Sequence, residues 1–345
     1  MIAKTLFLAK TFHRYGTQSF RDHESRPAEY PAGYLLFPFN SGNLRLEAVI
    51  AATGQQSEAL VNSDDATAPR KDAEEEELMA KIDTTVPVSA RIWNYWMGGT
   101  DYFPVDKAAG DQYAAVFPGV FDLARASRAF IIRVVRYLAG EAGIRQFLDI
   151  GTGLPSHDNT HEIAQRVAPE SRVVYVDNDP MVIAHARALL TSNPAGNTDY
   201  IDSDVNDPGS ILGIAREKLD FTQPVAIMLM GMLGHVGDPA EDDDAYTQSI
   251  VATLRAALPS GGYLALNEAV DTDQDANKAL DDYNQTGAVP YRARRRDQIV
   301  RFFDGLELVD PGIVQLQDWR PEPGQPGPRS VPALGGIGRK ALGEP

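Results

Sequence analysis

An alternation of short apolar runs with helical segments, beginning at Arg145, constrains the fold more than any other feature. Strand-length runs such as QFLDI, RVVYVD, PVAIMLM and GYLALNEAV are separated by segments with helical spacing. This alternation predicts parallel strands joined by helical crossovers that cover both faces of a sheet. Near the end, LELVDPGIVQLQDW and VPALGGIGRKA have no helix between them. We therefore expect the sheet to end in an antiparallel hairpin.

The chain before this alternation divides into an N-terminal extension and a helical part. Residues 1–82 lack sustained periodicity and end in the polar run NSDDATAPRKDAEEEE, so we expect little fixed structure there. A misassigned translation start would give the same pattern. Helical spacing appears from Pro87 onward. We therefore predict a domain over residues 83–343, with a helical cap at 83–143 and an α/β core at 144–343.

Charge and composition exclude several classes of function. The chain has 48 acidic and 32 basic residues and a formal net charge of −16. This argues against nonspecific binding to nucleic acid or to anionic membranes, since both need a basic face. The absence of cysteine excludes disulfides, thiol catalysis and cysteine-based metal sites. No apolar run approaches the ~18 residues of a membrane span, and Lys4 and Lys10 interrupt the N-terminal stretch. We expect a soluble, cytoplasmic protein.

The segment FLDIGTGLPS carries the first indication of a ligand site. An apolar strand runs into Asp149, and Gly151 and Gly153 then allow a sharp turn and a close approach to a ligand. Asn159 and Glu162 have the spacing of a capping box at the start of the next helix. Because glycine turns between strand and helix are common, this segment alone is weak support for a nucleotide-like ligand.

Two further strand ends narrow the choice of ligand. A dinucleotide site usually has a third small residue after the second glycine, and this chain has Pro155–Ser156 there. The next strand ends in Asp177, a carboxylate that can accept both ribose hydroxyl protons in NAD and S-adenosylmethionine sites alike. The third strand leads to Asp204, where a carboxylate could accept a proton from an adenine amino group. Three acids at successive strand ends are stronger support than any one of them.

The chain resembles the class I S-adenosylmethionine-dependent methyltransferases, and among them an actinobacterial group long catalogued as a domain of unknown function. The resemblance covers roughly residues 84–341. The matching strings are SARIWNYWMGGTDYFPVDKAA, FLDIGTGLPS, NTHEIAQRVAPESRVVYVDNDPMVIAHARALL, SDVNDP and GGIGRK. It implies a Rossmann-like α/β fold, with a seven-stranded, mostly parallel sheet, an antiparallel last strand, helices on both faces and an N-terminal helical cap.

The resemblance also implies S-adenosylmethionine as the cofactor and a set of residues around it. The implied contacts are Asp149, Gly151 and Gly153 for the methionine part, Asp177 and Asn178 for the ribose, Asp204 and Val205 for the adenine, and Arg91, Tyr95, Gly98 and Gly99 in a cap folded over the cofactor. An acidic cleft suits this ligand, because it carries a sulfonium and an ammonium and no phosphate.

The sequence defines the acceptor side of the site less well. Methyl transfer needs a base only if the acceptor has to lose a proton. His235, after the strand PVAIMLM, and Glu268, at the end of the next strand, stand where such a base would lie, outside the carboxyl ends of the strands. Either residue can equally have a structural role, His235 within a turn and Glu268 as a hydrogen-bond acceptor.

We expect a methyltransferase that acts on a small molecule by in-line methyl transfer. The alternative is a non-catalytic S-adenosylmethionine-binding sensor or assembly partner, since no acceptor-side residue stands out. A nicotinamide-dependent oxidoreductase is disfavoured by Pro155–Ser156. The sequence does not reveal the methyl acceptor, the atom that is methylated or the oligomeric state.

No metal site is predicted. DTDQDANKALDD, residues 271–282, imitates a calcium loop but lacks the glycine at the sixth position and the glutamate at the twelfth. We place this stretch instead in a loop over the acceptor pocket, together with Tyr283 and Tyr291. His157 and His161 lack the HExxH order and a cysteine partner, which disfavours zinc.

Clustered charges and tryptophans are expected to be structural. Arg292 and the run Arg294–Arg296 could bind an acidic acceptor, but we favour their neutralising the five aspartates just upstream. The acids of EDDD, residues 241–244, precede a helix and favour its dipole. Trp93 and Trp96 are expected to pack in the core or the cap.

Overall fold

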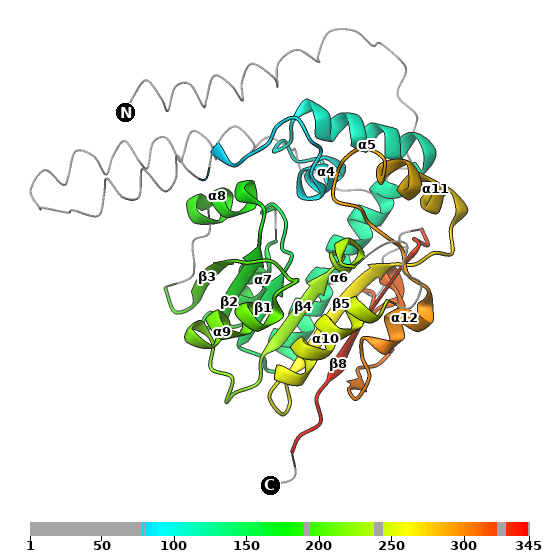
Figure 1. Ribbon diagram of the computed structural model, residues 1–345. Coiled ribbons are helices and arrows are strands. Elements are labelled where there is room, and N and C mark those ends of the chain that lie inside the picture. The colour runs from blue at the N-terminus through cyan, green and yellow to red at the C-terminus, as the bar shows by residue number, and fades with distance from the viewer. Residues whose placement is uncertain are drawn as a thin grey trace, which may run out of the picture. The chain divides into compact units, whose positions relative to one another are not determined.

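The computed structural model describes residues 78, 80–156, 158–189, 194–237, 244–322 and 329–343 of the 345-residue chain. Residues 1–82, for which little fixed structure was expected, therefore lie almost entirely outside the described residues. His157 also lies outside them. Among the described residues, no helix is both long and apolar enough to cross a membrane. The described part of the chain is an α/β structure in which helices flank one sheet (Figure 1).

The sheet has the strand order β3-β2-β1-β4-β5-β8-β6, and β7 also pairs with β8. The strand bounds are Gln146–Ile150 (β1), Arg172–Asp177 (β2), Asn197–Asp202 (β3), Ala226–Met230 (β4), Tyr263–Ala269 (β5), Glu307–Leu308 (β6), Val314–Gln315 (β7) and Ala333–Arg339 (β8). Strands β1 to β5 are parallel, whereas β8 runs antiparallel to β5, β6 and β7. The predicted fold, mostly parallel and antiparallel at its end, is confirmed. The sheet of the described residues has eight strands where seven were expected, because the two-residue strands β6 and β7 both pair with β8.

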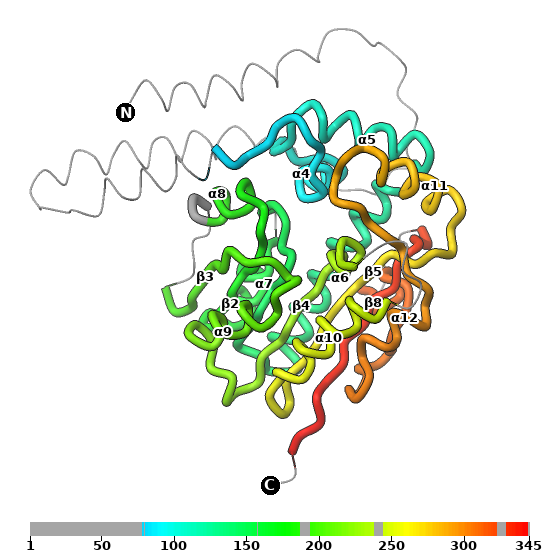
Figure 2. Tube along the Cα trace, in the orientation of Figure 1, coloured from blue at the N-terminus to red at the C-terminus, as the bar shows by residue number. Residues whose placement is uncertain are grey.

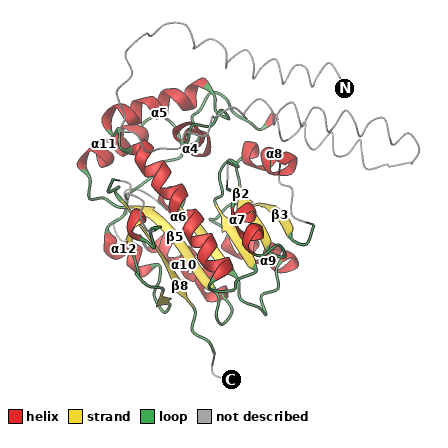
Figure 3. Cartoon of the chain, turned by 180° about the vertical axis from the view of Figure 1, so that it is seen from behind, coloured by secondary structure: helices red, strands yellow, loops and turns green. Residues whose placement is uncertain are grey.

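Helices cover both faces of the sheet, as the crossovers between parallel strands require. The bounds are Val120–Gly140 (α6), Thr160–Val167 (α7), Pro180–Leu189 (α8), Pro208–Lys218 (α9), Ala245–Ala257 (α10) and Arg296–Arg301 (α12). Apolar residues of α6 and α7 join one core, and those of α9, α10 and α12 join the core on the other face. Figure 3 shows these helices from behind, with α8 near the β3 edge.

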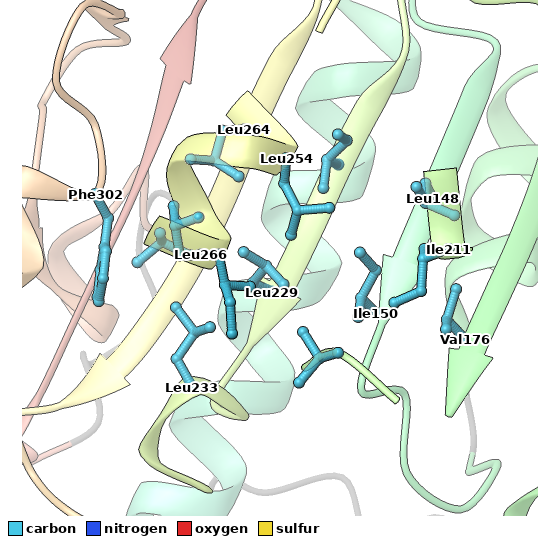
Figure 4. Packing of buried hydrophobic residues seen from close by; sticks show 14 of the residues in the cluster. Leu148, Ile150, Val176, Ile211, Leu229, Leu233, Leu254, Leu264, Leu266 and Phe302 are labelled. Carbon is cyan, nitrogen blue, oxygen red and sulfur yellow. The ribbon is translucent and has the colours of Figure 1, made fainter. Parts of the chain in front are cut away.

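Alternation along β1 determines where its acid lies. Leu148 and Ile150 belong to the core beneath α9 and α10 (Figure 4), whereas Phe147 belongs to the core beneath α6 and α7. Side chains alternate between the two faces along a strand, so Asp149 shares the face of Phe147. The acid is therefore turned toward α6 and α7.

Strand β8 is rich in glycine because its neighbours approach it closely from both sides. A Cβ atom on Gly335 would lie 2.6 Å from Cζ of Phe130 in α6, and one on Gly338 would lie 2.9 Å from Leu306 and Phe303. These distances are shorter than a carbon contact allows. The sequence GGIG therefore permits both flanking layers to pack on this strand.

The cap is assembled from two distant segments of the chain. Helices α4 (Ser89–Trp96) and α5 (Pro104–Val116) pack with α11 (Gln274–Tyr283), which is inserted between β5 and α12. Figures 1 and 3 both show α11 beside α5, and the trace in Figure 2 leads from β5 to α11 and back to α12. Trp93 and Trp96 pack edge-to-face within this cap, as expected.

The prediction that residues 271–282 form a loop is wrong, because most of them form α11. The Asp273 side chain caps this helix by accepting a hydrogen bond from Ala276 N–H at 2.9 Å. Ala276, Ala279 and Tyr283 then recur at helical spacing and are buried in the cap. Of the alternating aspartates, Asp273 thus caps α11 and Asp275 lies exposed on it.

An ion pair within the cap is almost fully buried. Asp106 Oδ1 accepts hydrogen bonds from Arg91 Nε at 3.1 Å and from Val88 N–H at 2.9 Å, and its Oδ2 accepts from Phe103 N–H at 2.8 Å. The two side chains are 2% (Arg91) and 0% (Asp106) exposed. The Arg91 guanidinium also donates to the carbonyls of Asp83 and Val86. This one carboxylate therefore joins α4, α5 and the segment before each of them.

We predict that Asp106→Ala lowers the free energy of unfolding by about 3 kcal/mol or more, because it leaves the Arg91 charge buried without a partner. The exposed pair Arg125–Asp122 provides the control, since Asp122→Ala should cost less than about 1 kcal/mol. Urea unfolding of both variants measures the difference. Equal losses would show that the buried pair does not hold the cap.

Candidate functional site

A pocket opens at the carboxyl ends of the central strands. Its lining residues come from α6, β1, the turn after β1, the start of α7, β2, α8, β3 and β4: Arg128, Ile131, Asp149, Gly151, Thr152, Gly153, Pro155, Asn159, Thr160, Tyr175, Val182, Ala186, Tyr200 and Met230. Three of the predicted site residues, Asp149, Gly151 and Gly153, are among them. Ligands of open parallel sheets bind at this edge.

The glycine turn has the backbone geometry that its sequence predicts. Gly151 and Gly153 have φ angles of 72° and 64°, in the left-handed region that side chains with a Cβ disfavour. A Cβ atom on Gly151 would also lie 2.6 Å from Cγ of Met232, which follows β4. Ala90 of the cap lies 4.0 Å from the Cβ position of Gly153. The turn is therefore enclosed by the β4 loop on one side and by α4 on the other.

The carboxylate of Asp177 joins the end of β2 to this turn. Its Oδ2 accepts a hydrogen bond from Gly153 N–H at 2.9 Å, and its Oδ1 accepts from Asn178 N–H at 2.9 Å and Asp179 N–H at 3.1 Å. Burial nevertheless raises the pKa of Asp177. A carboxylate with three backbone donors is held rigidly, and it retains one lone pair, on Oδ2, for a further donor.

The next strand end lies beside that of Asp177. Asn178 Nδ2 donates to Asp204 Oδ2 at 3.3 Å, and Asp204 Oδ1 accepts from both Asn206 N–H and Asn206 Nδ2 at 2.8 Å. The Asp204 side chain is exposed, whereas Val205 is buried. The structure thus brings Asp177, Asn178 and Asp204 together at the ends of two neighbouring strands.

Asp149 is the one acid among the residues that line the pocket, and 7% of its surface is exposed. Its Oδ2 accepts a hydrogen bond from the Thr160 hydroxyl at 2.6 Å. Burial raises the pKa of Asp149 to about 6, although this hydrogen bond and the Arg128 charge favour the ionised form. Thr160 follows Asn159, which forms the predicted capping box with Glu162 at the start of α7.

Arg128 lies opposite Asp149 in the pocket, and sequence reasoning missed it. Its guanidinium donates to the Ser156 hydroxyl and, at 3.4 Å, to the Asp158 carbonyl. Burial lowers the pKa of Arg128, against the attraction of nearby carboxylates led by Asp149. The only signal in the sequence was a cation between the apolar positions of α6, a pattern that is also typical of a solvated helix face.

His235 lies in the short 3-10 helix η1 (Leu233–His235) after β4, and both ring nitrogens have partners. Nδ1 lies 3.0 Å from the Pro290 carbonyl, and Nε2 lies 2.8 Å from Ser89 Oγ. A carbonyl only accepts, so Nδ1 carries the proton and Nε2 accepts from the Ser89 hydroxyl. Burial lowers the pKa of His235. The ring is therefore neutral near pH 7, with its basic nitrogen turned to α4.

Glu268, near the end of β5, is 1% exposed. Its Oε1 accepts from Leu233 N–H at 2.9 Å, where η1 begins, and its Oε2 lies 3.3 Å from the Tyr291 hydroxyl. The Tyr291 ring packs edge-on against His235 with centroids 4.8 Å apart. Burial raises the pKa of Glu268 to about 7, opposed chiefly by Arg294. Glu268 therefore fixes η1, which contains His235, and the segment of Tyr291, which packs against the His235 ring.

The arginine cluster does not neutralise the aspartates upstream, contrary to our expectation. Arg292 and Arg294 each lie 2.8 Å from an oxygen of Asp244, and Arg294 also lies 3.4 Å from Glu268. Arg294 is fully buried. Asp244 precedes α10, but its carboxylate makes no capping hydrogen bond. This ion-pair network fastens the segment after α11 to β5 and to the start of α10.

The cap residues that were predicted to contact the cofactor do not line the pocket. They are Arg91, Tyr95, Gly98 and Gly99. The Arg91 guanidinium is occupied by Asp106, and the Tyr95 hydroxyl donates to Asp111. The cap does reach the turn through Ala90 and Phe103, which pack on the cluster of Leu154, Met181 and Val182. A contact of the four predicted residues with a cofactor stays a prediction.

The raised pKa of Asp149 gives a pH-dependent prediction for stability. Between the ordinary pKa of 3.8 and about 6, the folded protein binds more protons than the unfolded chain, so the free energy of unfolding falls as pH rises. Asp149→Asn cannot ionise and should be more stable than wild type by up to about 3 kcal/mol above pH 6. Near pH 4 the two proteins should be equally stable.

Thermal or urea unfolding across this pH range tests the prediction. Asp202→Asn, at the exposed end of β3, is the control and should show no gain at any pH. A gain for Asp149→Asn that is the same at pH 4 and pH 7.5 would contradict an ionisation effect.

Comparisons with known proteins show the family to which the chain belongs. A family model described as S-adenosyl methyltransferase matches residues 75–341. The chain is similar to a DUF574 family protein of Streptomyces avermitilis, with 44% identity over 75% of this chain and 100% of that one and a TM-score of 0.70. It is also similar to a putative methyltransferase of Thermobifida fusca, with 39% identity over 75% and 97% of the two chains and a TM-score of 0.68. No curated protein matches it. The chain belongs to the S-adenosyl methyltransferase family and is an S-adenosylmethionine-dependent methyltransferase.

Proposed function

We propose that the protein transfers the methyl group of S-adenosylmethionine to a protic group of a small molecule, by in-line displacement. The observation that carries this proposal is a series of three acids at neighbouring strand ends. Asp149 lines the pocket with the glycine turn, Asp177 accepts a hydrogen bond from Gly153 of that turn, and Asp204 contacts Asn178 beside Asp177. A net charge of −16 further favours a small acceptor over a nucleic acid, because a phosphate backbone would be repelled.

The residues present fit the cofactor. The Asp177 carboxylate is held by three backbone N–H groups and keeps one lone pair, on Oδ2, for a ribose hydroxyl. Asp204, beside Asn178, supplies an acceptor for the adenine amino group. The acids also give the pocket the negative potential that attracts a cationic ligand. When bound, S-adenosylmethionine supplies an electrophilic methyl group on a sulfonium.

His235 is the proposed general base. Its Nδ1–H is fixed by the Pro290 carbonyl, which leaves Nε2 as the basic atom, and Nε2 already accepts a hydrogen bond from the Ser89 hydroxyl. An acceptor hydroxyl in place of that of Ser89 would meet the same lone pair. We assign to Glu268 the positioning of His235 rather than a proton transfer, since its oxygens are used by Leu233, Tyr291 and Arg294.

We predict that Asp177→Ala weakens the binding of S-adenosylhomocysteine about 10- to 100-fold, the loss expected for hydrogen bonds to a charged group. Isothermal titration calorimetry measures it. Asp202→Ala is the matched control, because Asp202 ends the neighbouring strand in register with Asp177, and its affinity should not change. Equal affinity for Asp177→Ala and wild type would sink the proposed cofactor site.

We predict that His235→Asn lowers the rate of methyl transfer about 10²- to 10⁴-fold, the usual contribution of a general base, and leaves S-adenosylhomocysteine affinity unchanged. Wild-type activity should rise with pH and level off near neutrality, because burial places the pKa of His235 below 6.5. The assay follows labelled methyl groups from the cofactor into a small-molecule extract. His185→Asn is the control. Label that never enters any product would favour a binding protein without turnover.

A further inference from the structure

The proposed base does not itself line the pocket at the glycine turn, but helix α4 reaches both. His235 is absent from the residues that line the pocket. Its basic atom, Nε2, lies 2.8 Å from Ser89 Oγ. The next residue of α4, Ala90, lies 4.0 Å from the Cβ position of Gly153 in the turn. Because consecutive Cα atoms are about 3.8 Å apart, α4 presents neighbouring residues to the base and to the turn.

The Ser89 hydroxyl can still accept a hydrogen bond. Nδ1 of His235 carries the ring proton, since it faces the Pro290 carbonyl, so the Ser89 hydroxyl is the donor to Nε2. A serine hydroxyl has one proton to donate and two lone pairs that accept. Within the described part of the chain, no N–H or O–H group donates to Ser89 Oγ. Ser89 is only half-buried. A methyl acceptor can therefore donate to the serine while the serine donates to the base.

Both partners of this hydrogen bond are held in place. The Val88 N–H, just before Ser89, donates to Asp106 Oδ1 at 2.9 Å, and Arg91, two positions after Ser89, pairs with the same carboxylate. The His235 ring is fixed through its Nδ1. Moving α4 to separate Ser89 from the base would break the buried ion pair, and breaking such a pair is costly. An acceptor therefore reaches the lone pair of Nε2 more easily through the serine than by moving the helix.

We propose that Ser89 is a catalytic residue that relays a proton from the methyl acceptor to His235. This inference rests on the proposed function and adds to it the group that the acceptor contacts. As the acceptor atom bonds to the methyl carbon, the electron pair of the broken carbon–sulfur bond stays on sulfur. The acceptor proton passes to Ser89 Oγ, and the Ser89 proton passes to Nε2. The serine ends as a neutral hydroxyl and the histidine as an imidazolium, which returns its proton to water.

Ser89→Ala removes the relay with little change in shape. The transfer of labelled methyl groups from S-adenosylmethionine into a small-molecule extract should slow about 10²-fold or more, the usual contribution of proton transfer by a positioned side chain. Affinity for S-adenosylhomocysteine, measured by calorimetry, should not change, because the hydroxyl serves the acceptor. Ser249→Ala is the control and should change neither quantity, since Ser249 is exposed on α10 and its hydroxyl donates to the Tyr246 carbonyl of the same helix.

Two further variants separate the hydroxyl from the shape of the side chain. Ser89→Thr keeps the hydroxyl and Ser89→Val replaces it by a methyl group, so the first should transfer methyl groups about 10²-fold faster than the second. Because the serine and the histidine act as one unit, the double variant of Ser89→Ala with His235→Asn should be no slower than His235→Asn alone. Losses that multiply in the double variant would show two independent roles and overturn the relay.

The outcomes distinguish this inference from the proposed function. If wild type transfers no label, the proposed function fails and the relay fails with it. If wild type transfers label and Ser89→Ala is as fast or faster, the acceptor takes the place of the serine hydroxyl, and only the relay is overturned. If Ser89→Ala also loses S-adenosylhomocysteine, the helix itself is disturbed and the other two variants decide: a faster Ser89→Thr supports the relay, and equal rates overturn it.

Discussion

The hydrogen bond from Gly153 N–H to the Asp177 carboxylate is the interaction on which the site depends. It fixes the turn after β1 to the end of β2. The direction of this turn then determines how the chain enters α7. Because Asp177 also accepts from two other backbone groups, its carboxylate cannot rotate away. A parallel sheet brings the ends of β1, β2 and β3 to one edge, and this hydrogen bond converts that general geometry into a defined pocket.

The cap and the C-terminal part of the chain hold His235 from two sides. Arg91 and Asp106 hold α4 and α5 together at the buried centre of the cap, and α4 presents Ser89 to His235. From the other side, Glu268 and Arg294 secure η1 and the segment after α11. The proposed base is thus placed between α4 and the segment after α11, which are far apart in the sequence. Movement of the cap would change the partner of His235 Nε2, which is the atom that we propose as the base.

Short-range patterns in the sequence were sufficient to predict much of the fold and part of the site. The strand runs, the capping box of Asn159 and Glu162, and the two glycines each follow from short-range rules, and the structure has them where the sequence places them. Helix α11 was missed because its residues were placed in a loop over the acceptor pocket, although Ala276, Ala279 and Tyr283 already had helical spacing.

Long-range ion pairs were beyond the sequence. The partner of Arg294 is Asp244, 50 residues away, and nothing near Arg294 indicates that pairing. The position of Arg128 in the pocket likewise depends on the packing of α6 beside β1. Its neighbours in the sequence indicate only a helix. Conversely, Arg91 was predicted from resemblance to contact the cofactor, and the structure instead gives its guanidinium three partners within the cap.

The central claim is that the three strand-end acids and the glycine turn hold an adenosyl sulfonium in one orientation. A crystal structure of the protein with S-adenosylhomocysteine tests it most directly. The account predicts the ribose beside Asp177, the adenine beside Asp204 and Val205, and the methionine part beside Asp149 and the glycine turn. A ligand bound elsewhere, or bound in this pocket with the adenine and the amino-acid end exchanged, would contradict it.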